Sequence, residues 1–342
     1  MPATLRDVAD RAQVSVRTVS NVVSGYEHVS EKMRTRVMRA IDELGYVPNP
    51  VARTLRTGKT GLLSLVVPEI DVPFFSELAR AVIDEADALG FQVMIDQTGH
   101  DHERERQLLR GGGRRNLFDG MLFAPLATRE ELDDVEASEE LPIILLGEHV
   151  FDGRFDHVAI DNVQAAHDAT THLLESGRTR IAAIGAQPKE EYATPLQRTK
   201  GFQLALEEHG RQPVEALQMT APHYGRADGY AAAAALIAQG RRPDAIFCYS
   251  DLLAMGAVRA VFDAGLRVPE DIAVIGIDDI EEGRYSRPSL STVSLDIPFI
   301  ARTAVKRLAG RIDDPTLDAQ EFIAPHQLIP RESTAGEEAV SR

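Results

Sequence analysis

The 342-residue chain has one cysteine and no long apolar run. A single cysteine excludes a framework of internal disulfides and is typical of a protein kept in a reducing compartment. Cys248 lies in the apolar run AIFCYS, which favours a buried structural thiol over a nucleophile. No apolar run approaches the roughly 20 residues that span a bilayer, and the N-terminus lacks the pattern of a secretory signal. We therefore expect a cytoplasmic protein with no membrane partner.

The motifs of common enzyme classes are also missing. The sequence contains no HExxH, no GxSxG and no Walker pattern. The stretch RGGGRRN, residues 110–116, lacks the Lys-Ser/Thr pattern of a phosphate loop and ends a helix, so a helix-to-strand connection is favoured. The cluster His100-Asp101-His102 precedes a charged helix, which favours a solvated turn over a metal site. We predict no enzymatic activity, no cofactor and no metal.

Positive charge is scarce overall but concentrated in the first 60 residues. The formal net charge is -16, yet residues 1–60 hold 10 Lys and Arg against 6 Asp and Glu. The remaining chain holds 27 Lys and Arg against 47 Asp and Glu. A local positive field suits contact with phosphates, while an acidic remainder limits indiscriminate binding. The N-terminal segment is therefore electrically distinct from the rest of the chain.

Three short helices are expected in this basic segment. Thr4, Ser15 and Ser30 are good N-caps. Apolar residues recur after them at helical spacing. The residues expected to share one inward face are Leu5, Val8, Ala9, Ala12, Val19, Val22, Val23, Met33, Val37, Ile41 and Leu44. This pattern predicts a minimal helical domain.

The second of these helices carries polar side chains opposite its valines. Arg17 and Asn21 are four residues apart and share a face. Arginine can donate a bidentate pair to guanine, asparagine can pair with adenine, and Val16 can contact a thymine methyl group. The hydroxyl groups suited to phosphate oxygens are those of Ser15, Thr18 and Ser20. The helix pattern alone fits a DNA-reading face and an ordinary solvated face about equally well.

From Leu62 onward, apolar runs alternate with amphipathic segments such as residues 75–89. The runs are LLSLVVP, FQVMI, DGMLFAP, LPIILLG, RIAAIGA, DAIFCYS and IAVIGID. Such alternation indicates open parallel sheets with helices on both faces. Residues 62–330 are long enough for two α/β units. Ligands bind at the carboxyl ends of strands in such sheets, so two facing units predict a cleft.

The headpiece sequence TLRDVADRAQVSVRTVSNVVSGYEHVSEKMRTRVMRAIDELGYVPNPVARTL closely resembles that of the LacI/GalR family of transcriptional regulators. Four later stretches resemble landmarks of the family's effector domain: VPEIDVPFFSELARAVIDEADALGFQV, RTKGFQLALEEHG, SDLLAMGAVRAVFDAGLRVPEDIAVIGIDD and SRPSLSTV. The match is specific, because the turn spacing, the ARTL hinge and the α/β body occur together. The resemblance implies a three-helix helix-turn-helix headpiece and a periplasmic-binding-protein-like body of two parallel-sheet α/β subdomains.

The resemblance also implies domain limits. The headpiece is expected at residues 1–48, a hinge helix or linker at 49–60, and an effector-binding and dimerisation domain at 61–330. Within the last, subdomain 1 is expected at about 61–160 plus 293–320, and subdomain 2 at about 161–290 plus 321–330. Residues 331–342 are expected to be a tail. Because the tail lacks a long leucine heptad, we favour a homodimer, with a tetramer as the alternative.

Residue roles in DNA binding follow from the same resemblance. Val16, Arg17 and Asn21 occupy base-reading positions, and Leu55 occupies the position whose side chain wedges into the minor groove. The full set implied to contact double-stranded operator DNA is Thr4, Ser15, Val16, Arg17, Thr18, Ser20, Asn21, Ala52, Arg53, Leu55 and Arg56. A dimer would read a near-palindromic operator.

The effector-binding residues implied by the resemblance are Phe74, Phe75, Arg198, Tyr224, Ser250 and Asp278. Arg198 matches an arginine that holds a ligand hydroxyl or carboxylate, Asp278 an aspartate that accepts from ligand hydroxyls, and Tyr224 an aromatic stacking position. These groups suit a sugar, although relatives also bind purines and sugar phosphates. Roles unrelated to ligand binding remain open for three of them: Arg198 could be a surface helix residue, Tyr224 a loop packing residue, and Asp278 a cap of the following segment.

Some positions depart from the family pattern or keep a structural alternative. Leu295 is apolar where many relatives place a polar side chain, and Glu148 and His149 lie in a segment that differs from the commoner pattern. Asp251 is favoured as a helix N-terminal residue over a ligand contact. We expect Glu148 and His149 to affect effector specificity.

The sequence therefore predicts a regulator, most often a repressor in this family, whose operator affinity is set by a small effector that acts as inducer or corepressor. The alternative is a sugar-binding sensor or solute-binding protein without enzymatic activity, which the body alone would support. The attached headpiece argues against that alternative. A sugar-modifying enzyme would need a nucleophile or base with a partner in the cleft, and the sequence nominates none.

Overall fold

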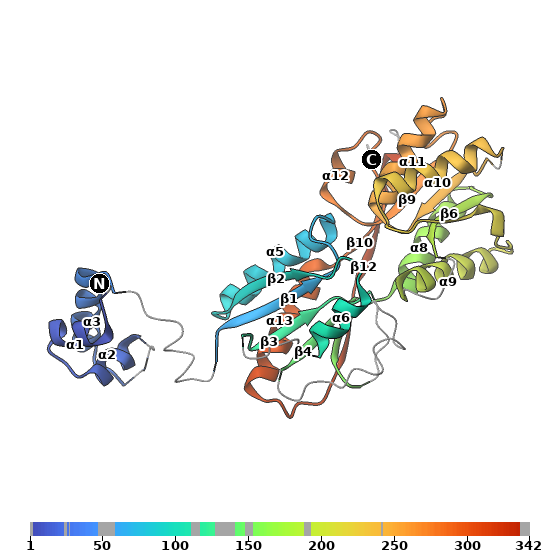
Figure 1. Cartoon of the computed structure of the whole chain (residues 1–342). Helices are drawn as coiled ribbons and strands as arrows, with labels where there is room; N and C mark the ends of the chain where they lie inside the picture. The colour runs from blue at the N-terminus through green and yellow to red at the C-terminus, as the bar shows by residue number, and fades with distance from the viewer. Residues whose placement is uncertain are drawn as a thin grey trace. The chain divides into compact units, whose positions relative to one another are not determined.

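The computed structural model describes residues 3–23, 26, 28–46, 59–110, 117–126, 141–147, 153–187, 193–240 and 242–335. The chain divides into two compact units, Met1–Gly61 and Leu62–Arg342, which we name the headpiece and the body (Figure 1). Within the described ranges, no helix is both long and apolar enough to cross a membrane. The expected connection at residues 111–116 lies outside these ranges.

The headpiece consists of α1 (Leu5–Ala12), α2 (Val16–Val23) and α3 (Glu31–Leu44). Thr4 caps α1 as predicted: its Oγ1 accepts from the backbone N–H of Asp7 at 3.3 Å, and its own N–H donates to Asp7 Oδ2 at 2.8 Å. Ser15 caps α2, because its Oγ accepts from the N–H of Thr18 at 3.0 Å. Ser30 occupies the N-cap of α3, but its side chain makes no capping hydrogen bond.

The three helices share one core, with a correction at its C-terminal end. The buried residues are Val8, Ala9, Ala12, Val19, Val22, Val37, Ala40 and Tyr46. Leu44, predicted to face inward, is 37% exposed. The reason is that α3 ends there at Gly45, whose positive φ of 58° turns the chain so that Tyr46 covers the core instead.

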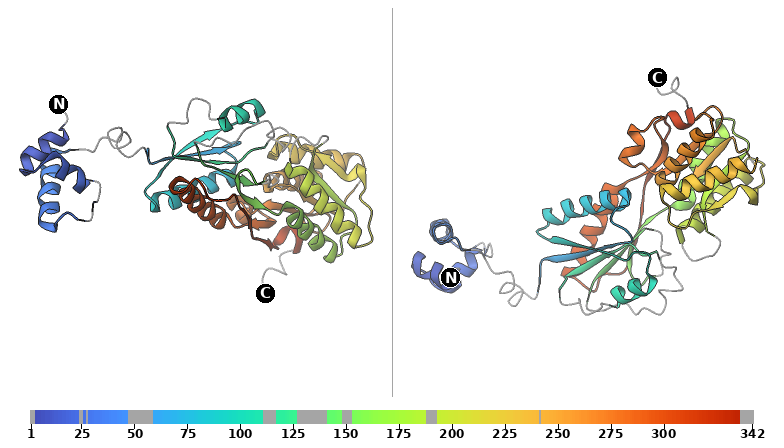
Figure 2. Two further views of the ribbon diagram at one scale, coloured as in Figure 1. Left: turned by 90° about the horizontal axis from the view of Figure 1, so that it is seen from below. Right: turned by 45° about the horizontal axis from the view of Figure 1, so that its top comes forward.

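The body begins with a six-stranded parallel sheet in the order β11-β5-β4-β3-β1-β2. Helices α5 and α13 cover one face of it and α6 covers the other (Figures 1 and 2). We name this unit the first lobe. Its strands are β1 (Leu62–Val67), β2 (Gln92–Gln97), β3 (Gly120–Phe123), β4 (Ile143–Gly147), β5 (Asp156–Ile160) and β11 (Glu321–Ala324), and its helices are α5 (Pro73–Ala88), α6 (His102–Leu109) and α13 (Ile297–Asp313).

The second lobe contains a six-stranded sheet in the order β12-β10-β9-β8-β6-β7. Its paired strands are parallel except for β12, which runs antiparallel to β10. Helices α8 and α9 cover one face, and α10 and α11 cover the other (Figures 1 and 2). The strands are β6 (Ile181–Ala186), β7 (Gln218–Thr220), β8 (Ala245–Cys248), β9 (Ala273–Asp278), β10 (Ser291–Leu295) and β12 (His326–Ile329). The helices are α8 (Asn162–Glu175), α9 (Ala193–Glu208), η1 (Glu215–Leu217), α10 (Arg226–Ala238), α11 (Asp251–Asp263), α12 (Glu281–Tyr285) and α14 (Glu332–Ala335).

Three crossings join the two lobes within the described residues: β5 to α8, β10 to α13, and β11 to β12. The last two are hydrogen-bonded together, since the N–H of Asp296 donates to the carbonyl of Pro325 at 3.1 Å. These crossings lie a few residues from the expected limits, because β10 pairs with β9 in the second sheet and β11 pairs with β5 in the first.

The segment after residue 330 also differs from the expected tail. Ser333 is buried, and its Oγ donates to the carbonyl of Val274 in β9 at 2.6 Å. Thr334 is buried beside it and is hydrogen-bonded to Ser291 at 2.7 Å. Helix α14 is therefore an integral part of the second lobe.

Candidate functional site: a recognition helix and an interlobe cavity

Helix α2 presents an exposed polar face opposite its buried valines. Val19 and Val22 are buried in the headpiece core, whereas Arg17 is exposed and Val16 is 45% exposed. Asn21 is half-buried on the same side as Arg17. An exposed apolar side chain beside a cation and an amide matches the donor, acceptor and methyl pattern of the major groove. The helix therefore has the chemistry required of a DNA-reading element.

Several of the hydroxyl groups implied to contact DNA serve helix caps. Thr4 Oγ1 donates to Asp7 Oδ2 at 2.7 Å, and the hydroxyls of Ser15 and Thr18 lie 2.8 Å apart. The Thr4 hydrogen bonds also lower the pKa of Asp7. Ser20 is half-buried on α2. These interactions fix the starts of α1 and α2.

An arginine of α3 also braces the turn between α1 and α2. Arg36 donates from Nη2 to the carbonyl of Gln13 at 2.8 Å and from Nε to that of Ala12. Gln13 has a φ of 51°, a backbone conformation that non-glycine residues adopt rarely. The guanidinium therefore helps to hold the turn that sets the angle of α2. The predicted hinge residues lie outside the described ranges: Ala52, Arg53, Leu55 and Arg56.

A cavity of about 160 Å³ lies in the body and is lined by residues of both lobes. Most of its lining follows the carboxyl ends of strands, as expected for parallel sheets. All of the residues predicted to bind the effector line it: Phe74, Phe75, Arg198, Tyr224, Ser250 and Asp278. Leu295, the noted apolar departure, lines it as well. Glu148 and His149 lie outside the described residues.

Arg198 is the buried cation of this cavity, with an exposure of 4%. Its Nε donates to Asn162 Oδ1 at 2.7 Å, and its Nη1 donates to the carbonyl of Tyr249. A buried guanidinium is stabilised only when such acceptors compensate for lost solvation. This arrangement excludes the surface-residue alternative for Arg198.

Tyr224 is held rigidly in the cavity wall. Its hydroxyl donates to the carbonyl of Gly185 at 2.7 Å, and its φ of 53° places it in the left-handed region. Ser250 Oγ donates to the carbonyl of Tyr224 at 3.3 Å and accepts from the N–H of Leu253 at 3.2 Å, so it also caps α11. Across the cavity, the rings of Phe74 and Phe75 pack edge to face at 5.2 Å. The wall thus offers aromatic surfaces and fixed polar atoms.

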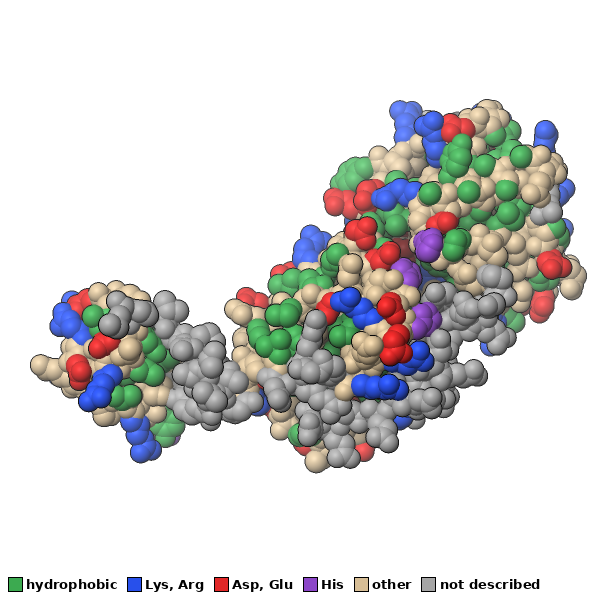
Figure 3. Space-filling view, in the orientation of Figure 1, with side chains coloured by type: hydrophobic (Ala, Val, Ile, Leu, Met, Phe, Trp, Pro, Cys, Tyr) green, Lys and Arg blue, Asp and Glu red, His purple; other side chains and the backbone are tan. Residues whose placement is uncertain are grey.

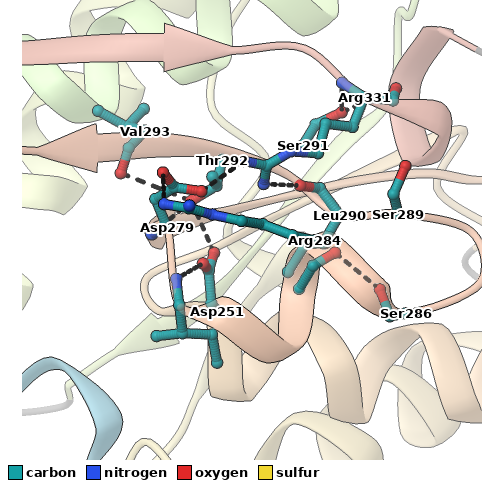
Figure 4. Close-up of polar contacts among 12 residues, drawn as sticks. Asp251, Asp279, Arg284, Ser286, Ser289, Leu290, Ser291, Thr292, Val293 and Arg331 are labelled. Carbon is teal, nitrogen blue, oxygen red and sulfur yellow. Dashed lines mark hydrogen bonds and ion pairs between the residues drawn. The ribbon is translucent and has the colours of Figure 1, made fainter. Parts of the chain in front are cut away.

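Asp278 reaches the cavity from a strained turn at the end of β9. Asp278 and Asp279 have positive φ angles of 125° and 58°, which cost energy in non-glycine residues. The Asp279 carboxylate holds this turn, because it accepts from Arg284 at 2.8 Å and from Arg331 at 2.5 Å (Figure 4). The N–H of Asp279 donates to Thr292 Oγ1 at 3.2 Å. The network leaves Asp278 on the cavity side and Asp279 in the wall.

Asp251 has a structural role in the same network. It is the first residue of α11, is fully buried, and accepts from Thr292 Oγ1 at 2.7 Å and from the N–H of Ile280 at 3.1 Å (Figure 4). Burial raises its pKa well above the ordinary range, and the nearby Asp278 raises it further. Cys248 is also fully buried, and burial raises the pKa of its thiol. Both residues match the structural roles predicted for them.

Five polar lining residues were not predicted to bind the effector: Glu69, His100, Gln187, Thr194 and His223. Four of them, all except Thr194, follow the carboxyl ends of β1, β2, β6 and β7, which is the signal that could have identified them. Asp101 caps α6 by accepting from the N–H groups of Glu103 at 2.9 Å and Arg104 at 3.1 Å. The segment 100–102 therefore combines a helix cap with a cavity residue.

Comparisons with known proteins agree with this architecture. The family model described as bacterial regulatory proteins, lacI family, matches residues 4–49, and that of the periplasmic binding protein-like domain matches residues 170–334. The ribose operon repressor of Halalkalibacterium halodurans is 35% identical, covering 98% of each chain.

Solved structures resemble the chain over nearly its whole length. The CelR–cellobiose complex is 30% identical, with a TM-score of 0.71, covering 97% of this chain and 99% of that chain. The lac repressor dimer bound to operator and the anti-inducer ONPF is 26% identical, with a TM-score of 0.86, covering 98% and 99%.

A helix-turn-helix headpiece joined to a two-lobed α/β body with a central cavity defines a ligand-responsive transcriptional regulator. The chain belongs to the LacI family, whose repressors bind operator DNA through the headpiece and a small effector through the body. The match includes the headpiece, which a solute-binding protein would not require.

Proposed function

We propose that this protein is a repressor that binds a near-palindromic operator as a homodimer and whose operator affinity is set by a sugar in the interlobe cavity. The observation that carries the proposal is the presence, in one chain, of an exposed Val16–Arg17–Asn21 face and a cavity with Arg198 and Asp278. Two symmetric headpieces would read two half-sites.

On the DNA side, Arg17 and Asn21 are the proposed base-reading residues, with Val16 in contact with a thymine methyl group. The proposed backbone contacts, which position the helix, are those of Thr4, Ser15, Thr18 and Ser20. The proposed minor-groove contacts of the hinge are those of Ala52, Arg53, Leu55 and Arg56. Since the relatives are regulators, we propose no enzymatic activity and a cytoplasmic location, where the DNA target lies.

On the effector side, the cavity has the groups that recognise a sugar. Arg198 is placed to donate to ligand oxygens, Asp278 to accept from hydroxyl groups, and Phe74, Phe75 and Tyr224 provide apolar faces. The solved transcriptional regulator CelR, 30% identical to this chain, was determined in complex with cellobiose. A coupling free energy of about 1–3 kcal/mol between cavity and headpiece would give a useful change in operator occupancy.

Selection of a DNA pool by the full-length protein, followed by fluorescence anisotropy on the enriched duplex, tests the proposal. We expect a near-palindrome to be enriched and its affinity to change with one compound from a panel of sugars and nucleobases. If no DNA sequence is enriched, either in the presence or in the absence of these compounds, the proposal that the protein is a sequence-specific regulator is refuted.

A matched pair of arginine variants sharpens the test. Arg17→Ala should lose about 1–3 kcal/mol of discrimination at one base step. Arg39→Ala, an exposed arginine on α3, should leave that discrimination unchanged. An equal loss on random and selected DNA for Arg17→Ala would contradict the base-reading role.

A further inference from the structure

Two histidines from opposite lobes face each other where the cavity meets solvent. His100 follows β2 in the first lobe, and His223 precedes α10 in the second lobe; both line the cavity. Their ring centroids lie 6.1 Å apart, with the planes at 77°. The His100 side chain is 27% exposed and His223 is exposed, whereas Arg198 is buried. Histidine side chains gather on one face of the body (Figure 3).

The backbone holds His100 firmly at this entrance. Thr98 and Gly99 continue the pairing of β1 and β2, since their N–H groups donate to the carbonyls of Val67 at 3.0 Å and Pro68 at 2.9 Å. On its other side, Asp101 caps α6. Between these anchors, His100 adopts a φ of 61°, which is rare for a non-glycine residue and persists only where the surroundings enforce it.

Glu69 completes the first-lobe side of the entrance. Its Oε1 lies 3.3 Å from His100 Nε2, and it lines the same cavity. The opposing loop is anchored on both sides of His223. The carbonyl of Ala221 accepts from Gln187 Nε2 at 2.6 Å, and the hydroxyl of Tyr224 donates a hydrogen bond to the carbonyl of Gly185. Both halves of the entrance are therefore built on fixed loops, one in each lobe.

The charge at this entrance favours an uncharged ligand. Among the described lining residues, Glu69 and Asp278 are acidic and Arg198 is the one Lys or Arg; Arg198 is 4% exposed, whereas the Glu69 side chain at the entrance is 37% exposed. A phosphate group near Glu69 would meet like charge with little compensation. Imidazole nitrogens both donate and accept, which matches sugar hydroxyl groups.

We propose that His100, His223 and Glu69 form a clamp that binds the hydroxyl groups of an unphosphorylated sugar from both lobes and excludes sugar phosphates. The inference rests on the proposed sugar effector and adds the residues and the ligand class at the cavity entrance. Because each imidazole belongs to a different lobe, the two act on the ligand together only in the closed cavity.

Isothermal titration calorimetry on the full-length protein tests the clamp. The probes are D-ribose, D-glucose and cellobiose, together with ribose 5-phosphate and glucose 6-phosphate. We expect one or more of the unphosphorylated sugars to bind and the matching phosphates to bind at least about 10-fold more weakly. Glu69→Gln should narrow that difference by weakening the exclusion of phosphate.

Single and double histidine variants test the clamp with the sugar that binds. His100→Ala and His223→Ala should each weaken binding about 3- to 10-fold. The double variant should lose less than the product of the two single losses, since the contacts are coupled. His102→Ala, two residues away and not in the cavity lining, is the matched control and should bind like the unaltered protein.

The outcomes separate the clamp from the proposed function. Sugar binding that is lost in Arg198→Ala but unchanged in both histidine variants would overturn the clamp and leave the sugar effector standing. Tighter binding of a phosphorylated sugar than of the matching unphosphorylated sugar would overturn the proposed exclusion of sugar phosphates. Binding of a nucleobase from the panel under Proposed function and of no sugar, or of no probe at all, would overturn both the clamp and the sugar effector.

Discussion

Arg198 Nε donates to Asn162 Oδ1 at 2.7 Å, and Asn162 is the first residue of α8, directly after the β5 crossing between the lobes. Asn162 is fully buried, and its Nδ2 also donates to the carbonyl of Ile160 at 3.4 Å. The cation of the cavity and one interlobe crossing are thus joined by a single side chain. A ligand that repositions Arg198 would therefore act on one of the segments that join the two lobes.

Asn162→Ala should weaken effector binding about 10-fold, because the buried Nε of Arg198 loses its acceptor and the guanidinium its orientation. Asn162→Asp keeps an acceptor oxygen and should retain most of the affinity. Calorimetric titration of both variants with the sugar that binds the unaltered protein measures the difference in affinity. Equal losses in the two variants would point to a general packing defect rather than to positioning of Arg198.

Asp156 should be a major contributor to the stability of the first lobe. It is fully buried at the start of β5 and accepts from Arg307 Nε and Arg311 Nε, each at 2.5 Å, and from the N–H of Gln320 at 3.0 Å. Asp156→Ala leaves two guanidinium groups without their shared carboxylate and should cost about 3–5 kcal/mol of unfolding free energy. Urea denaturation measures the cost, and a loss below about 1 kcal/mol would contradict it.

A cluster between α8, α9 and β12 should make stability depend on pH. Burial lowers the pKa of His167, but hydrogen bonds to Glu208 and Asp168 outweigh it, so the pKa lies above 6.5. Burial raises the pKa of Asp168, but hydrogen bonds from His326, Gln164 and His167 bring it below 3.8. Because its pKa is raised, His167 stabilises the folded state fully below about pH 6.5, and this contribution is lost as the pH rises through its folded pKa. Because its pKa is lowered, Asp168 stabilises the folded state above about pH 4, and this contribution is lost as the pH falls through its folded pKa.

His167→Gln should therefore lower the melting temperature most near about pH 5 and least near about pH 9. His209→Gln is the control, because the Nδ1 of His209 is hydrogen-bonded to the backbone carbonyl of Ala205 at 2.8 Å rather than to a carboxylate. Thermal unfolding across this range measures both variants. If His167→Gln lowers the melting temperature by the same amount at every pH, the titration of His167 does not contribute to stability.

Two helical glycines should respond oppositely to alanine. A Cβ on Gly201 in α9 would lie 2.1 Å from the carbonyl oxygen of Val163, so α8 and α9 would have to separate. Gly201→Ala should destabilise the second lobe by about 1–3 kcal/mol. At Gly310 in α13 the nearest atom, Leu317 Cδ1, is 3.7 Å away, so Gly310→Ala should be neutral or gain up to about 1 kcal/mol from helix propensity. Denaturation of the two variants side by side checks the contrast.

Local chemistry in the sequence was sufficient for most of the secondary structure. The caps at Thr4 and Ser15 and the valine stripe of α2 follow from hydrogen-bonding groups and helical spacing, which need no distant partner. The apolar runs became β1, β3, β4, β6, β8 and β9, because continuous apolar segments must be buried on both faces of a sheet. Most of the run FQVMI became β2, but this strand lies at the edge of the first sheet, where Met94 and Ile95 are exposed. The family resemblance placed the headpiece and the cavity residues by number.

Tertiary structure decided what depends on partners distant in sequence. Strand β11 (EFIA) was not among the predicted apolar runs and joins the first sheet by pairing with β5, which moves the crossing to Pro325. The links from Arg198 to Asn162 and from His100 to His223 join residues that are 36 and 123 positions apart in the sequence. The sequence by itself determined the headpiece and the α/β class through short-range periodicity. Only the folded chain decided which polar groups share the cavity, since burial and pairing are properties of the assembled lobes.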